Sequence, residues 1–285
     1  MPTGVFRIGL EGGGARLARG DPTAGPRELL PAGLTLDDLL GPDGPGLSDL
    51  LAMDVDGAVP VVATVLAPIE SQEVWAAGVT YLRSREARAE ESVDATPYDL
   101  VYEAERPELF FKAPGWRVRG PGEPIAIRAD SPWNVPEAEL ALVLDARMRV
   151  AGFAIGNDVS SRSIEGENPL YLPQAKVYDG SCGLGPCIVP AGQVDPPFAI
   201  ALEVRRGGRP AFGGTCGTEL MRRSFHDLAA YLGRALTFPV GAVLLTGTGL
   251  VPDPSFSLAE GDEVRISIEG LGVLANVVAV TGALG

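Results

Sequence analysis

The chain has 285 residues and a formal net charge of −14, with 46% hydrophobic and 21% charged residues, a composition typical of a globular protein rather than a disordered one. So acidic a chain is not expected to bind nucleic acid or an anionic membrane, because both need basic patches. No apolar run approaches the roughly 20 residues of a membrane span, and the start MPTGVFRIGLEGGG has no signal-peptide pattern, so we expect a cytoplasmic protein.

The first part of the chain, up to about residue 62, is rich in glycine and proline with short apolar pieces between them. VFRIGL and ARLARG flank a GGG turn and predict a hairpin, whereas LTLDDLL and LSDLL predict one or two short helices. We therefore expect a small N-terminal α+β subdomain over residues 1–70 and a larger domain over residues 71–285.

From Val74 onward the pattern changes to short apolar segments separated by turn residues. Nearly all of these segments are alternating or β-branched, which is typical of strands. The predicted strands are VWAAGV, ELFFKA, PIAIRA, AELALVLD, VAGFAIGND, FAIALEVRR, GAVLLTGT, DEVRISIEG and GVLANVVAV. The larger domain is therefore expected to be α+β but mainly β.

Helices are few in this pattern. MRRSFHDLAAYLGRAL (221–236) has apolar residues at helical spacing, and SREARAEESV (84–93) predicts a second helix. The strands do not alternate regularly with helices, and neither GxGxxG nor GxxxxGK[ST] occurs, so no nucleotide cofactor is expected. The three cysteines form no CxxC pair, which argues against a disulfide framework or a thiolate zinc site.

Two glutamates, Glu137 and Glu139, stand at the head of the apolar segment NVPEAELALVLD. Side chains alternate across a strand, so both carboxylates lie on one face, roughly 7 Å apart along the chain, with Leu140 and Leu142 on the other face. Buried carboxylates that converge need either paired Arg or Lys or a divalent cation. An edge strand whose glutamates face solvent is the competing interpretation.

A third carboxylate, Asp158, follows the strand-like VAGFAI in the segment GNDVSSR (156–162). The two strands are close enough in sequence to form a hairpin, which would bring Asp158 to the same place. Three carboxylates without histidine suit Mg²⁺, with Mn²⁺ or Ca²⁺ as substitutes, rather than zinc.

Five motifs occur in an order that resembles the fumarylacetoacetate hydrolase superfamily over residues 72–282. They are PEAELALVLD, GNDVSSRS, YLPQAKVYDGSCGLGP, LLTGTGLVP and EGDEVRISIEGLGVLAN. YLPQAKVYDGSCGLGP and YLRSREARAEES are most similar to the 2-keto-3-deoxy-D-arabinonate dehydratases and related sugar-acid dehydratases of this superfamily.

The resemblance implies a mixed β-roll or sandwich fold, like the C-terminal domain of fumarylacetoacetase, with bound Mg²⁺. It implies Glu137, Glu139 and Asp158 as metal ligands and Lys176 as a lysine beside the metal. Lys176 would stabilise an enolate or, with its pKa lowered, exchange protons. Further residues that the resemblance implies are Glu108 as an acid or base and, for contact with substrate, Thr248 and Asp179.

One departure from the superfamily pattern bears on the reaction. Hydrolases of this superfamily show G-x-N-Y-x-x-H-x-x-E, whose His and Glu activate water, whereas here Ser84 and Ala87 occupy the His and Glu positions of GVTYLRSREA. Ser84 and Arg85 are therefore candidates for binding substrate hydroxyls or carboxylate, with an exposed basic helix start as the alternative. Arg162 is expected to make a structural ion pair, and His226, the only histidine, is assigned no chemistry.

The resulting functional prediction is Mg²⁺-dependent dehydration of a 2-keto-3-deoxy sugar acid through a metal-stabilised enolate. A 2-keto-3-deoxypentonate such as the D-arabinonate derivative would give 2,5-dioxopentanoate. The alternative is C–C bond hydrolysis of the acylpyruvate or fumarylacetoacetate type. Two less favoured hypotheses are a non-catalytic metal-binding protein and a metal-free carbohydrate-binding module. The resemblance to the superfamily also implies a homodimer or homotetramer.

Overall fold

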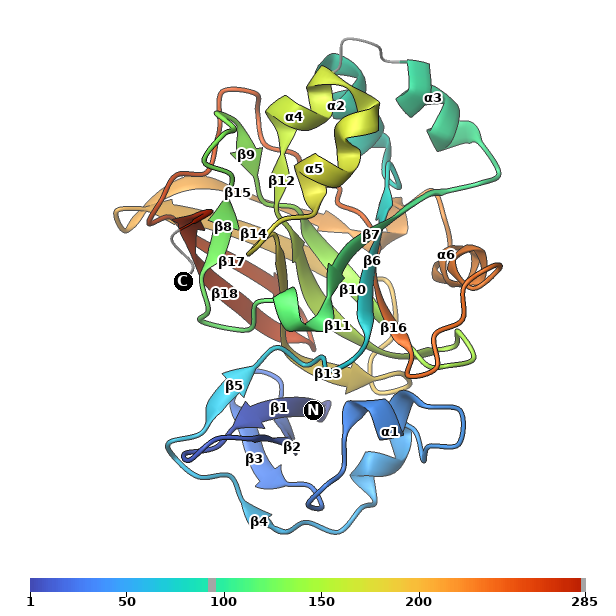
Figure 1. The fold of residues 1–285 in the computed structure, drawn as a ribbon, viewed down its shortest axis with the longest axis vertical. Helices are drawn as coiled ribbons and strands as arrows, with labels where there is room; N and C mark the ends of the chain where they lie inside the picture. The colour runs from blue at the N-terminus through green and yellow to red at the C-terminus, as the bar shows by residue number, and fades with distance from the viewer. Residues whose placement is uncertain (92–95, 283–285) are drawn as a thin grey trace.

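The computed structural model of the protein describes residues 1–91 and 96–282 and consists mainly of strands (Figure 1). The largest sheet runs through the middle of the molecule and has 11 strands. Its order is β4 (Gly57–Ala58), β3 (Gly25–Leu29), β2 (Ala15–Asp21), β1 (Gly4–Gly9), β13 (Cys182–Pro190), β11 (Val150–Asp158), β10 (Ala138–Leu144), β16 (Ala242–Leu245), β6 (Glu73–Gly78) and β7 (Glu108–Pro114), with β5 (Thr64–Leu66) paired to β1.

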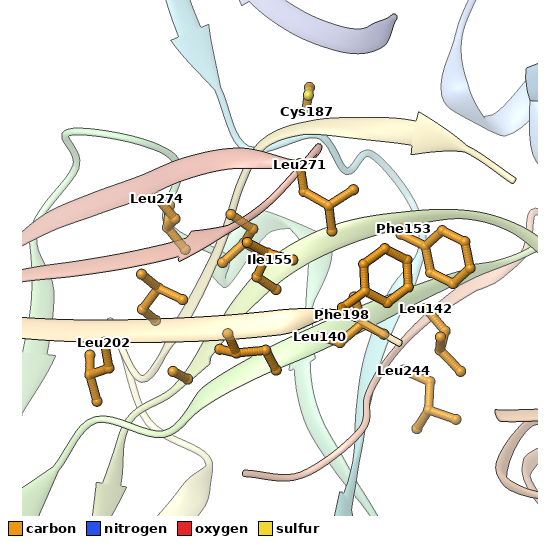
Figure 2. Close-up of a cluster of buried hydrophobic side chains, with 14 of the residues drawn as sticks. Leu140, Leu142, Phe153, Ile155, Cys187, Phe198, Leu202, Leu244, Leu271 and Leu274 are labelled. Carbon is orange, nitrogen blue, oxygen red and sulfur yellow. The ribbon is translucent and has the colours of Figure 1, made fainter. Parts of the chain in front are cut away.

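A second sheet of five strands packs against the large one. Its order is β15 (Arg209–Gly217), β14 (Ala199–Arg206), β17 (Glu263–Ile268), β18 (Gly272–Val280) and β8 (Ile125–Ile127), and a separate pair joins β12 (Ser160–Ser161) to β9 (Asn134–Val135). Figure 2 shows apolar side chains from both sheets meeting in this core, among them Leu140, Phe153, Leu202 and Leu274. The expected mainly β architecture is confirmed.

The helices are short and lie outside the sheets. They are α1 (Leu36–Leu40), α2 (Leu82–Glu91), α3 (Thr96–Glu103), α4 (Arg162–Glu167), α5 (Leu172–Lys176) and α6 (Phe225–Leu232), with 3-10 turns at Leu47–Leu51, Gly115–Arg117, Pro169–Tyr171 and Thr218–Leu220. Helices α2, α4 and α5 gather at one end of the large sheet, beyond the tips of β6 and β7 (Figure 1). This end of the molecule contains the predicted site residues.

Strand predictions from local pattern are confirmed, including the hairpin β1–β2 around GGG and the strands β11 and β18 with the predicted bounds. The helix predicted over 221–236 is too long at both ends. Ser224 accepts a hydrogen bond from the Asp227 N–H and caps α6, and the helix ends before Gly233 because a capping serine and a glycine both favour helix ends. The helix predicted over 84–93 starts earlier, at Leu82, and its last two residues lie outside the described residues.

The two long strands β13 and β15, several shorter strands and the helices α3, α4 and α5 were missed. β13 carries CGLGPCIVP and β15 carries RPAFGGTCG, both of which read as turns because of their glycines and prolines. β13 joins β11 to β1 and so connects the N-terminal strands to the rest of the large sheet. The division of the chain near residue 70 stays a prediction.

Candidate active site

Glu137 and Glu139 lie at the buried start of β10, a central strand between β11 and β16. Leu140 and Leu142 point into one hydrophobic core, whereas Ala141 lies in a second core on the opposite face, so the predicted alternation is confirmed. The two glutamates are 4% and 1% exposed. The interpretation of an edge strand with solvent-facing glutamates is therefore wrong.

Asp158 reaches the same place from the neighbouring strand. β10 and β11 form the expected antiparallel pair, with Ala138 opposite Asn157, and the Asp158 N–H donates to the Glu137 carbonyl at 3.0 Å. Carboxylate oxygens of Glu137, Glu139 and Asp158 all lie within 4.8 Å of one another. The hairpin thus brings together three buried carboxylates.

The TGT loop holds Glu139. The Gly247 N–H donates to Glu139 Oε2 at 2.6 Å, and Gly247 has a φ of +88° with Thr80 Oγ1 only 2.0 Å from the position of a Cβ. Thr80, which replaces the superfamily's asparagine, donates from its hydroxyl to the Thr246 carbonyl at 2.6 Å. Only glycine fits at position 247, so the loop backbone reaches the carboxylate.

Lys176 lies at the end of α5 and its ammonium bridges two of the three carboxylates. It donates to Glu137 Oε1 and Asp158 Oδ2, both at 2.9 Å, and to Ser160 Oγ at 2.6 Å. Burial lowers the pKa of Lys176, but the charges of Asp158 and Glu137 outweigh burial and raise it above its usual value. With these carboxylates alone Lys176 is an ammonium ion at neutral pH, and a pKa lowered beside a bound metal ion stays a prediction.

Two arginines and a glutamate complete the charged cluster around Glu137. Arg88 Nη2 donates to Glu137 Oε1 at 2.8 Å, Arg88 Nη1 lies 3.1 Å from Glu165 Oε2, and Arg162 Nη2 lies 3.5 Å from Glu137 Oε1. Burial raises the pKa of Glu137, but Lys176, Arg88 and Arg162 together hold it well below its usual range. Arg162 makes an ion pair as expected, whereas Arg88 and Glu165 were missed.

A second buried lysine was also missed. Lys112 in β7 has no exposed surface, pairs with Asp158 Oδ1, and donates to the carbonyls of Val159 at 3.1 Å and Lys176 at 2.5 Å. Alternation along ELFFKAP places Glu108, Phe110 and Lys112 on one face. That signal was available in the sequence, because Glu108 had already been singled out there.

Glu108 lies opposite Gly78 in the β6–β7 pair. Its Oε2 is 2.0 Å from the place where a Cβ on residue 78 would be, so its carboxyl group lies across the glycine backbone. Burial, followed by the charge of Glu165, raises the pKa of Glu108 to about 7. Glu108 can therefore gain or lose a proton near neutral pH.

A narrow cleft joins most of the predicted residues. It is lined by Ala77, Gly78, Val79, Ser84, Arg88, Glu108, Phe110, Glu137, Asp158, Glu165, Lys176, Gly247 and Thr248. The Ser84 hydroxyl donates to the Tyr81 carbonyl at 2.8 Å, and Thr248 Oγ1 accepts from the Leu250 N–H at 3.1 Å. The β-branched Val79 has a φ of +52°, a strained conformation of the kind that recurs at active sites.

Arg85 and Asp179 are not among the residues that line this cleft. Arg85 Nε lies 3.6 Å from Asp99 Oδ1, and its guanidinium lies 5.2 Å from the Tyr102 ring in α3. Asp179, with a side chain that is 67% exposed, pairs with Arg117 at 2.9 Å. His226 is exposed on α6.

The donor set of Glu137, Glu139 and Asp158 fits a divalent cation. The three ligands are hard oxygens. Lys176 donates to Glu137, the Gly247 N–H donates to Glu139, and Asp158 is contacted by Lys112 at one oxygen and by Lys176 at the other. Burial and the charges of Asp158 and Glu137 raise the pKa of Glu139 well above its usual value. An added positive charge would reverse that effect and favour the ionised form.

The chain is similar in sequence to a known protein family and to proteins named as dehydratases. Residues 73–279 match the family described as fumarylacetoacetate (FAA) hydrolase C-terminal. The chain is 51% identical over 213 residues to the probable 2-keto-3-deoxyxylonate dehydratase of Haloferax volcanii, covering 74% of this chain and 73% of that protein. It is 45% identical over 213 residues to the 2-dehydro-3-deoxy-D-arabinonate dehydratase of Saccharolobus solfataricus, covering 73% and 72%.

A solved structure of 2-keto-3-deoxy-D-arabinonate dehydratase, complexed with magnesium and 2,5-dioxopentanoate, matches with a TM-score of 0.82 and 33% identity over 97% of this chain and 98% of that one. No helix in the described part of the chain is long and apolar enough to span a membrane.

Proposed function

The chain belongs to the fumarylacetoacetate hydrolase family, and we propose that it is a Mg²⁺-dependent dehydratase that converts a 2-keto-3-deoxypentonate to 2,5-dioxopentanoate. The observation that carries this proposal is the cluster of three buried carboxylates, two of which line a cleft together with Lys176 and Glu108. The relatives at 51% and 45% identity are named as dehydratases of such acids. The activity is therefore that of a carbon–oxygen lyase.

The lining of the cleft favours dehydration over hydrolysis. Ser84 occupies the place of the hydrolases' histidine, and its hydroxyl is bonded to the Tyr81 carbonyl. No histidine is among the described residues that line the cleft, so a His–Glu pair that activates water is missing from it.

Glu137, Glu139 and Asp158 would hold Mg²⁺. When bound, the ion supplies a Lewis acid that polarises the ketone of a 2-keto acid and so acidifies its C3 protons. The chain's own cations also contact these ligands, since Arg88 donates to Glu137 and Lys112 pairs with Asp158. Such outer contacts orient metal ligands and tune their affinity.

In this proposal Lys176 stabilises negative charge and Glu108 transfers protons. The Lys176 ammonium ion, fixed by three acceptors, would stabilise the negative charge that develops on the substrate when C3 loses a proton. Glu108, with a pKa of about 7, is suited to take the C3 proton or to protonate the departing C4 hydroxyl. Thr248 and Ser84 line the cleft and are proposed to contact substrate.

The direct test is a dehydratase screen of the purified protein with Mg²⁺ against stereoisomeric 2-keto-3-deoxypentonates and 2-keto-3-deoxyhexonates. A semialdehyde product from a pentonate, detected with an aldehyde dehydrogenase or by mass spectrometry, supports the proposal. Release of pyruvate from an acylpyruvate control, without dehydration of any sugar acid, would instead identify a C–C bond hydrolase.

We also propose that the protein works as a homodimer or homotetramer in the cytoplasm. Large apolar side chains are exposed at Leu170, Trp116 and Leu100, and contact with another copy would bury such side chains. Light scattering after size exclusion measures the mass, and a monomer at micromolar concentration would contradict the assembly.

A further inference from the structure

Glu165 is a buried carboxylate that the roles above do not use. It lies in α4, lines the cleft and is 4% exposed. Its Oε2 lies 3.1 Å from Arg88 Nη1, but that contact lacks the alignment of a hydrogen bond, and no donor among the described residues makes a hydrogen bond to this oxygen. Glu165 Oε2 thus has an unused acceptor position inside the cleft.

Such an oxygen is costly to bury. A buried carboxylate oxygen without a hydrogen-bond donor forfeits its hydration, and almost all buried polar atoms in proteins find a partner. The charge of Glu165 is compensated by Arg88, but its hydrogen-bonding capacity is not. A donor supplied by a ligand would satisfy it, and the hydroxyl group is the neutral donor that a sugar acid carries.

The order of groups along the cleft indicates which hydroxyl this is. The carboxylate and ketone of a 2-keto acid belong at the hard-oxygen ligands Glu137, Glu139 and Asp158. Glu108 is assigned to the reacting C3 and C4 atoms. Arg88 lies between Glu137, which its Nη2 contacts, and Glu165, which its Nη1 faces, so Glu165 is left for the substrate end remote from the ketone.

We propose that Glu165 accepts a hydrogen bond from the terminal C5 hydroxyl of the substrate and thereby selects hydroxylated 2-keto-3-deoxy acids, with Arg88 as the positioning residue that holds Glu165. This inference rests on the proposed dehydratase function. Because Arg88 also donates to Glu137, the same guanidinium links the hydroxyl-binding carboxylate to the ligand set at the other end of the substrate.

A pair of substrates isolates this contact. 2-Keto-3-deoxypentonate carries both the C4 and the C5 hydroxyl, whereas 4-hydroxy-2-oxopentanoate carries only the C4 hydroxyl. Both can lose a C3 proton and the C4 hydroxyl as water, so the chemical step is retained, and the second compound gives 2-oxopent-3-enoate, a conjugated ketone that is followed by its absorbance. Up to the loss of water, the two substrates differ only in the C5 oxygen. The 5-hydroxy-2-oxopent-3-enoate formed from the pentonate then moves a C5 proton to C3, and the resulting enol tautomerises to 2,5-dioxopentanoate.

The experiment measures kcat/KM of the wild type, Glu165→Gln and Glu165→Met with both substrates. The wild type should prefer the C5-hydroxylated substrate by roughly 10- to 100-fold, as expected for a hydrogen bond to a charged group and for a site built to bind a hydroxyl. Because the charge of Glu165 acts on Glu108, Glu165→Met changes the rates with both substrates, but kcat/KM should fall further with 2-keto-3-deoxypentonate, so that the preference is lost. Glu165→Gln, which retains a weaker acceptor, should fall in between.

Glu167→Gln is the matched control, because Glu167 lies in the same helix but is exposed; it should keep the wild-type preference. Misfolding lowers the rates with both substrates equally, so the ratio of the two reports only the hydroxyl contact. An equal loss with both substrates in Glu165→Met, or a wild type without preference, would overturn the inference while leaving the dehydratase function intact. Failure of the wild type to dehydrate either compound would remove the proposed function and this inference with it.

Discussion

Glu137 is the residue on which most of the cleft's charges converge. Its Oε1 accepts from Arg88 at 2.8 Å and Lys176 at 2.9 Å, and Arg162 lies 3.5 Å away. Three cations around one oxygen keep the carboxylate ionised and fix its orientation. A substitution of Glu137 therefore tests whether the oriented carboxylate is a metal ligand.

Replacing Glu137 with Gln, or Asp158 with Asn, should weaken Mn²⁺ binding by at least about 10- to 100-fold, because each removes a charged ligand that the surrounding cations orient. Electron paramagnetic resonance of free Mn²⁺ measures this affinity without a substrate. Glu203→Gln, on the exposed part of β14, should bind as the wild type does. Unchanged affinity in both cleft variants would disprove the assignment of the metal ligands.

Glu108 makes the stability of the metal-free protein depend on pH. Its pKa is about 7 in the folded protein against an ordinary 4.5, so the folded state binds the proton more tightly than the unfolded state. The stabilisation is therefore complete below pH 4.5 and is lost as pH rises through about 7, up to about 3 kcal/mol in total. Glu108→Gln should not show this fall in the free energy of unfolding as pH rises.

Urea unfolding at pH 5 and pH 8 in the presence of a chelator checks that prediction. From pH 5 to pH 8 the wild type should lose more free energy of unfolding than Glu108→Gln does. Parallel changes in both proteins would show that Glu108 titrates with an ordinary pKa.

At the scale of elements, the pairing of β6 with β7 fixes the position of the acid/base residue Glu108. Gly78 and Glu108 are cross-strand partners, and partners on one face of a pair lie side by side. The glutamate side chain folds over Gly78 because no Cβ is there. Gly78 is thus a positioning residue, because its lack of a side chain determines where the Glu108 carboxyl group lies.

Gly78→Ala should therefore displace the Glu108 carboxyl group and lower kcat/KM by on the order of 10²-fold, the usual cost of a misplacement of about 1 Å, while Mn²⁺ affinity stays unchanged. In a Glu108→Gln background the same substitution should have little further effect. Gly9→Ala is the control, since its Cβ would meet Leu66 at an ordinary 3.5 Å. Additive losses in the double variant would refute the positioning role of Gly78.

At the scale of the whole molecule, the ligand carboxylates come from two central strands of the large sheet, β10 and β11. A metal ion held there binds the folded state and stabilises the entire fold by linkage. Mg²⁺ at 100 times its Kd should add about 2.7 kcal/mol to the free energy of unfolding.

Thermal unfolding with Mg²⁺ and with chelator measures this increment. The rise in Tm should be present in the wild type and absent in Glu139→Gln, whose own metal-free stability need not fall because the pKa of Glu139 is raised there. An equal rise in both proteins would mean that Mg²⁺ stabilises the fold from another place.

Much of this molecule could be predicted from local pattern. The strands β10, β11 and β18 follow from alternation and β-branched residues. The position of Glu137 and Glu139 on the same face follows from the two-residue period of a strand. Asp158 joins them because a short connection favours a hairpin. The identity of the site as a metal centre, and its likeness to a family of dehydratases, follow from these residues together with the five ordered motifs.

Only the tertiary structure decided which charges surround that site. Arg88, Lys112 and Glu165 come from α2, β7 and α4, and each meets a partner at least 46 residues away in the sequence. β13, read as turns, is a central strand because it pairs with both β11 and β1. A repeating pattern specifies which face a side chain takes, but contacts between distant segments depend on packing of the complete chain, and no local period encodes them.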